Sequence, residues 1–297
     1  MRRNIDFLGM RKYFFALSIV LVLVAVGALV ARGLNFGIEF QGGTVMTFNT
    51  TGVTTEELRD ALDAVGIAEA TIQPVEGEGF LVRTSESDVN AASEAFDKVV
   101  AELGLQGQQQ TVTTIGPNWG ANITNRAVMA LVLSLAALLI YISFRFEYKM
   151  SLTAILALVH DVLITLGIYA LVGREVTPNT IAALLTILGY SIYDTIVVFH
   201  RIKENSQRLV KRTFLDMANE SINQVFARSI NTSLTSLIPV VALLFFGGET
   251  LKDFAFALTM GLLLGAYSSI GVAAPVYSVW KEREPKYQAL RKKLAKG

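Results

Sequence analysis

Residues 180–199 read TIAALLTILGYSIYDTIVVF. A mostly apolar stretch of this length can cross about 30 Å of hydrocarbon as a single α-helix. Asp194 stands inside the stretch, where a carboxylate costs about 2.5–3.5 kcal/mol on insertion scales. Membrane helices keep such groups when they are paired, hydrated in a cavity or used in function. The stretch therefore predicts both a membrane fold and a candidate functional site.

The rest of the chain repeats this apolar pattern. Apolar residues make up 52% of the 297 residues and charged residues only 17%, below the quarter that is usual in soluble domains. We expect six transmembrane helices, at residues 13–31, 127–144, 151–172, 180–199, 229–247 and 254–277. The first apolar run is longer than the core of most signal peptides, so we expect it to be retained. Cleavage near Val26-Gly27-Ala28 is the alternative.

Lysine and arginine residues gather on one side of these spans, which predicts the cytoplasmic side. They are Arg2, Arg3, Arg11, Lys12, Arg145, Lys149, Arg201, Lys203, Arg208, Lys211, Arg212, Lys281, Arg283, Lys286, Arg291, Lys292, Lys293 and Lys296. Both termini are then cytoplasmic, and residues 33–123 lie outside. That exterior segment holds 13 acidic residues and three basic ones, which argues against nucleic-acid binding. The chain has no cysteine, which excludes disulfides and thiolate chemistry.

The exterior segment has the pattern of a small α+β domain. Thr54 and Glu57 form a capping-box motif at the start of one helix, and Asp88 precedes a second. Strands are expected at residues 44–50, 70–75, 80–83 and 109–115. The order βαββαβ predicts a ferredoxin-like fold, which we interpret as a binding or mechanical module. The fold class is therefore an α-helical polytopic membrane protein with a small periplasmic α+β domain.

We divide the chain into four parts. Residues 1–32 are the cytoplasmic N-terminus and first span, and residues 33–123 are the exterior domain. Residues 124–278 carry spans two to six and include an amphipathic helix at about 201–227 along the cytoplasmic interface. Residues 279–297 form a basic cytoplasmic tail.

Other predicted spans also contain polar residues. His160 and Asp161 lie near the middle of the third span, and Arg228 opens the fifth. Thr232, Thr235 and Ser236 follow Arg228 at helical spacing, as Thr165 follows Asp161 and as Tyr190 and Ser191 precede Asp194. These positions predict a polar pocket between spans three, four and five, with Arg228 as the partner of Asp194. Each also has a structural reading: the hydroxyls can satisfy the backbone or neighbouring helices, His160 can be a packed neutral histidine, and Arg228 can extend to the interface. Asp161 can be a structural hydrogen-bond acceptor, and Asp194 part of a structural ion pair.

A buried aspartate that alternates between dry and arginine-paired surroundings can take up and release a proton in each cycle. One charge moved through the membrane potential supplies about 2.3 kcal/mol per 100 mV. That free energy biases a conformational equilibrium roughly fifty-fold, which suits a proton-coupled machine.

Several motifs resemble the SecF family of bacterial protein-export membrane proteins. They are NFGIEFQGG at 35–43, VHD at 159–161, GYSIYDTIVVF at 189–199, RIKEN at 201–205, RSINTS at 228–233 and GAYSSI at 265–270. The resemblance covers nearly the whole chain and the expected six spans. It implies a location in the bacterial plasma membrane, a SecD partner in an RND-type assembly, and association with the SecYEG channel.

The resemblance further implies use of the proton gradient to assist export of an unfolded preprotein, with protons as the only coupling ion and no other cofactor. It assigns proton transfer to Asp194 and Arg228, with Thr232 in the same motif; Asp161 and His160 complete our candidate relay. Gly189, Tyr190, Ser191, Ser233 and Gly265 are carried as motif or packing positions. Three positions depart from the family pattern: Glu39, Tyr193 and His200.

Two other functions fit the spans less well. An RND-type half-transporter for a small molecule or lipid needs a large ligand cleft, for which the exterior domain is small. An intramembrane aspartyl protease needs Asp161 and Asp194 as a dyad that shares a proton. The distance between the two carboxyl groups decides that reading.

Overall fold

The computed structural model describes residues 4–50, 52–67, 70–75, 79–86, 88–105 and 110–295. The chain folds into two compact units. A helical unit contains residues 1–35, 130–174 and 179–297, and a smaller unit contains residues 36–129 and 175–178. The short strands β1 (Asn35–Phe36) and β6 (Glu175–Val176) stand where the chain passes from one unit to the other.

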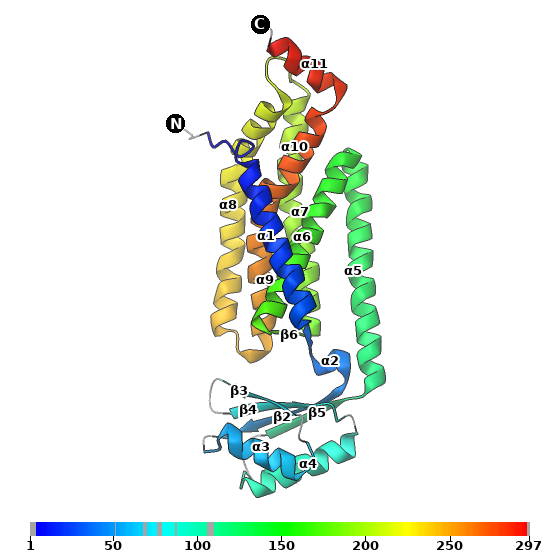
Figure 1. The fold of residues 1–297 in the computed structure, drawn as a ribbon, viewed down its shortest axis with the longest axis vertical. Helices are drawn as coiled ribbons and strands as arrows, with labels where there is room; N and C mark the ends of the chain where they lie inside the picture. The colour runs from blue at the N-terminus through cyan, green and yellow to red at the C-terminus, as the bar shows by residue number, and fades with distance from the viewer. Residues whose placement is uncertain are drawn as a thin grey trace. The chain divides into compact units, whose positions relative to one another are not determined.

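Among the described residues, six helical segments are long and apolar enough to cross a membrane, as the sequence predicts. The helices are α1 (Arg11–Arg32), α5 (Pro117–Arg145), α6 (Tyr148–Val172), α7 (Pro178–Ser206), α8 (Phe214–Phe246) and α9 (Glu249–Ser268). In the sixth span, α9 continues through a π-helical turn (Ser269–Ala273) into α10 (Ala274–Glu282). Helix α11 (Pro285–Leu294) follows, at the same end of the unit as the start of α1 (Figure 1).

The prediction of a separate amphipathic helix at 201–227 is wrong. Residues 201–206 extend α7, and the rest belongs mainly to α8, which begins at Phe214 after a cap by Thr213. The Thr213 hydroxyl accepts a hydrogen bond from the backbone N–H of Asp216 at 3.1 Å. Apolar side chains of the first turns, such as Met217 and Ile222, are buried in the core of the helical unit. That burial explains why α8 is continuous and does not lie flat on an interface.

Close helix approach depends on small residues. A Cβ at Gly261 of α9 would collide with Ile187 of α7, and one at Gly265 would lie 3.0 Å from the Cβ of Ser191. This confirms that the GxxxG pattern packs helices together. Gly189 behaves differently, because it is exposed and a Cβ there meets nothing within 4 Å. It is not a packing position within this chain.

Two sets of polar contacts connect segments of the helical unit at the end that carries the termini. Asn223 accepts a hydrogen bond from the Ile5 N–H at 2.8 Å, and Asn219 accepts one from the Leu8 N–H at 3.1 Å. Both amides also donate to the Ile5 carbonyl. We call these four bonds the N-terminal clamp.

The second set of contacts is an ion-pair network between α6, α10 and the start of α11. Lys149 binds Glu284 at 2.8 Å, and Lys281 binds Glu147 at 2.5 Å and Glu284 at 3.1 Å. Partial burial disfavours the charged form of Glu284, but hydrogen bonds from Lys149 and Lys281 outweigh it and lower the pKa of this carboxyl. The network therefore holds Glu284 ionised and fixes the C-terminal helices to α6.

The smaller unit is a four-stranded antiparallel sheet with two helices on one face (Figure 1). Its elements are α2 (Ile38–Gln41), β2 (Gly43–Asn49), α3 (Thr55–Ala64), β3 (Thr71–Val75), β4 (Gly79–Thr84), α4 (Val89–Glu102) and β5 (Gln110–Ile115). The strand order is β3-β4-β2-β5. The Thr54–Glu57 capping box and the Asp88 cap are both present. The predicted order of strands and helices is confirmed.

Candidate functional site

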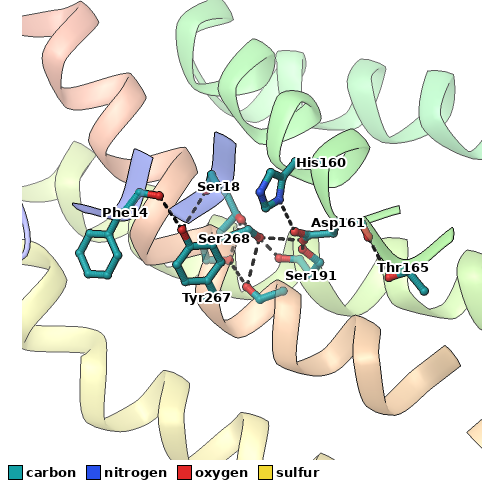
Figure 2. A network of polar contacts seen from close by, with 11 residues as sticks. Phe14, Ser18, His160, Asp161, Thr165, Ser191, Tyr267 and Ser268 are labelled. Atoms are coloured by element: carbon teal, nitrogen blue, oxygen red, sulfur yellow. Dashed lines mark hydrogen bonds and ion pairs between the residues drawn. The ribbon is translucent and has the colours of Figure 1, made fainter. Parts of the chain in front are cut away.

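Asp161 is the most enclosed carboxylate of the helical unit. It is 0% exposed and lies on α6. Ser191 of α7 and Ser268 of α9 each donate a hydrogen bond to Oδ2 at 2.7 Å, and His160 Nδ1 lies 3.0 Å from Oδ1 (Figure 2). Three helices thus converge on one carboxyl group. Such hydrogen bonds offset much of the cost of burying a charge.

The same network reaches α1. The Tyr267 hydroxyl, next to Ser268 on α9, donates to the Phe14 carbonyl at 2.7 Å and lies 2.8 Å from the Ser18 hydroxyl (Figure 2). The rings of Tyr267 and His160 are neighbours, with centroids 6.3 Å apart. His160 Nε2 is buried without a hydrogen-bond partner among the described residues. The polar cluster around Asp161 therefore has one unsatisfied nitrogen.

The π-helical turn begins directly after Ser268. Ser269, its first residue, lies 2.9 Å from the Thr195 hydroxyl of α7, while Ser268 reaches Asp161 of α6. Two consecutive serines therefore serve two different helices. π-helical turns inside α-helices are frequent at functional sites.

Asp194 forms a second, separate cluster between α7 and α8. Its carboxyl group is buried, with the residue only 2% exposed, and it accepts a hydrogen bond of 3.3 Å from Ser233 of α8. On the same pair of helices, the Tyr190 hydroxyl donates to the Thr232 carbonyl at 2.9 Å. The expectation of one pocket between spans three, four and five is wrong, because the sixth span supplies a partner of Asp161.

Arg228 and Asp194 do not form the expected ion pair within the part of the chain described. The guanidinium donates instead to the hydroxyl of Tyr193 at 3.2 Å. It still lies close enough to interact electrostatically with Asp194. The sequence departs from the family pattern at Tyr193. The hydroxyl of this tyrosine therefore binds the arginine that was expected to bind the Asp194 carboxylate.

The hydroxyl groups of the remaining candidate residues form hydrogen bonds within their own helices. The Thr232 hydroxyl donates to the Arg228 carbonyl and the Thr165 hydroxyl to the Asp161 carbonyl, each within its own helix. Thr235 likewise bonds its own backbone. These contacts agree with the structural reading of the helix hydroxyls. Sequence reasoning did not select Ser268, Ser18 or Tyr267 as site residues, although the motif at 265–270 contains two of them.

Asp161 and Asp194 do not meet as a catalytic dyad. Over the described residues, no hydrogen bond joins the two carboxyl groups, and each binds different side chains. A dyad shares one proton between adjacent carboxyls. The protease reading therefore lacks its geometry. Nor do the described residues contain a cluster of His, Asp and Glu able to hold a metal ion.

These features define a class: a polytopic membrane protein with two buried carboxylates, each bonded across helices. Comparison with known proteins identifies the family within this class. Residues 95–283 match the C-terminal family model of protein export membrane protein SecD/SecF, and residues 27–51 match the SecD/SecF GG motif. The chain belongs to the SecF family of protein translocase subunits.

Individual relatives agree. The SecF subunit of Streptomyces coelicolor is 40% identical over 97% of this chain and 80% of its own length. The SecDF subunit of Thermus thermophilus is 39% identical over 96% of this chain. Its crystal structure matches with a TM-score of 0.85 over 95% of this chain. The chain spans only about 40% of that longer protein.

Proposed function

We propose that this chain couples inward proton flow to preprotein export through the Sec channel. The observation that carries the proposal is Asp194, a buried carboxylate near Arg228 that, among the described residues, accepts a hydrogen bond from the Ser233 hydroxyl and forms no ion pair. A buried carboxylate without a fixed ion pair can exist in either protonation state at modest cost. Family membership supplies the process that such a group can drive.

Proton exchange at Asp194 can change helix contacts. When Asp194 is ionised, attraction to Arg228 competes with the bond between Arg228 and Tyr193. When it is protonated, that attraction is lost and Arg228 stays on Tyr193. The two states therefore favour different α7–α8 arrangements, and the proton gradient drives the exchange between them.

Asp161 and His160 provide the continuation of the route. Their cluster joins α6, α7, α9 and α1, so a change of charge there acts on four spans. Protons are the only coupling ion that the proposal needs. Small-molecule transport is disfavoured by the translocase relatives.

We further infer the topology. The basic flanks place both termini in the cytoplasm of a bacterium and the chain in its inner membrane. The sheet order β3-β4-β2-β5 with helices after β2 and β4 is that of a ferredoxin-like unit. This unit then lies in the periplasm, where an unfolded preprotein leaves the SecYEG channel.

The test is Asp194→Asn in the complex with SecD. In membrane vesicles, we expect loss of the proton-gradient stimulation of preprotein translocation, because asparagine cannot carry the proton. Assembly is checked by co-purification with SecD, and Thr186→Val, an exposed position on the same helix, serves as control. Stimulation that survives in Asp194→Asn would falsify the proton-coupling proposal.

A further inference from the structure

A water-accessible cavity of about 480 Å³ lies between α7 and α8, beside the Asp194 cluster. Arg228 lines one part of it, and His200, Glu204 and Gln224 line another. The volume suffices for several water molecules. The cavity therefore connects the arginine next to Asp194 with polar groups at the end of the helical unit that carries the termini.

Most of the polar groups around this cavity are engaged. Arg201 binds Glu204 at 2.6 Å and donates to Gln224 at 2.5 Å, and Asn205 donates to Gln224 and Ser221. These bonds join α7 to α8 and neutralise Glu204. His200 is different: among the described residues its imidazole makes no hydrogen bond, and the residue is exposed.

His200 also lines a second cavity, of about 210 Å³, with Arg145, Lys203, Glu204 and Gln207. His200 and Glu204 therefore line both cavities. The charged groups that face His200 are Arg228 from α8, Arg145 from α5, and Arg201, Lys203 and Glu204 from its own helix. Imidazole is the side chain suited to exchanging protons near neutral pH.

We propose that His200 is the proton-exchange group at the cytoplasmic mouth of the relay. This rests on the proposed function and adds its exit step. A proton released by Asp194 crosses the water of the α7–α8 cavity and binds an imidazole nitrogen of His200, which becomes imidazolium. The imidazolium then loses the same proton to cytoplasmic water.

The test measures gradient-stimulated translocation by the complex with SecD in vesicles whose cytoplasmic face is outward, at fixed gradient and varied outer pH. For the natural protein, stimulation falls as the outer pH is lowered, because imidazolium cannot accept a further proton. His200→Gln lowers the stimulation by about a hundredfold and removes that inflection. His200→Asp restores stimulation and moves the inflection to lower pH, since a carboxylate stays able to accept protons there.

Two further measurements separate this role from a structural one. Imidazole added outside His200→Ala vesicles restores stimulation, whereas a purely structural histidine is not replaced by free imidazole. Gln207→Ala, in the smaller cavity, leaves the pH profile unchanged. A profile in His200→Gln that matches the natural protein overturns the assignment of His200. If Asp194→Asn still abolishes stimulation in that case, the proposed function stands without it.

Discussion

At the scale of single residues, Asp161 shows how this membrane protein holds a buried carboxyl group. Two serine hydroxyls and an imidazole converge on it from α6, α7 and α9. The sequence pointed to Asp161 and Asp194 because carboxylates are rare in apolar spans. It could not point to Ser268, since serine is common in membrane helices and can bond either its own backbone or a neighbouring helix. Only the fold brings that hydroxyl to another helix.

Removing one donor from Asp161 tests this arrangement. We expect Ser268→Ala to lower the free energy of unfolding by about 1–3 kcal/mol, because a buried carboxyl group loses a hydrogen-bond donor. Ser18→Ala is the matched control: its partner Tyr267 keeps the bond to Phe14, so the loss is below about 1 kcal/mol. Denaturant titration in detergent measures both. Equal losses in the two variants contradict the role given to Ser268.

At the scale of helices and strands, hydropathy and capping motifs predicted what forms but not always where it ends. The six spans follow from long apolar runs, and the strands and helices of the smaller unit follow from alternation and caps. The sequence did not predict that the first half of α8 is continuous with the fifth span. Its polar residues resemble those of an interfacial helix, and only the fold shows that its apolar side packs against the core. The π-helical turn was missed because its residues do not differ from those of an α-helix.

Packing of α9 against α7 is open to a direct test. Gly261→Ala places a methyl group against Ile187, so we expect a loss of about 1–3 kcal/mol in unfolding free energy. In a double-mutant cycle, Ile187→Ala makes room for the added methyl group. The double variant is therefore expected to lose less unfolding free energy than the sum of the two single variants. Gly189→Ala, which meets no atom within 4 Å, leaves stability unchanged or slightly higher. A loss at Gly189 as large as that at Gly261 argues against specific packing.

At the scale of the whole molecule, one helix face is too polar for lipid. Arg228, Asn231 and Thr235 are exposed on α8, and Tyr193 is 46% exposed on α7. A charged side chain in a membrane span normally faces protein or a water-filled cavity. The longer relative carries a SecD part in the same chain, so we expect SecD to cover this face. The sequence predicted the polar residues of this face, but not that Arg228 is exposed on the surface of the chain.

Cysteine labelling checks which surface is covered, and the chain has no native cysteine to interfere. We expect Thr235→Cys to react with a maleimide in the isolated chain in detergent and to be protected in the complex with SecD. Val210→Cys, at a loop position that is 69% exposed, reacts in both samples. Equal labelling of Thr235→Cys with and without SecD places the partner on another face.

The N-terminal clamp has a consequence for biosynthesis. Its partners are more than 200 residues apart, since the bonds join Ile5 to Asn223 and Leu8 to Asn219 across 218 and 211 positions. A ribosome needs about 10–40 s to make that much chain. During this interval the first residues have no α8 to bind, and α1 must be retained in the membrane by its own apolar length. The clamp therefore closes only after the fifth span has begun to emerge.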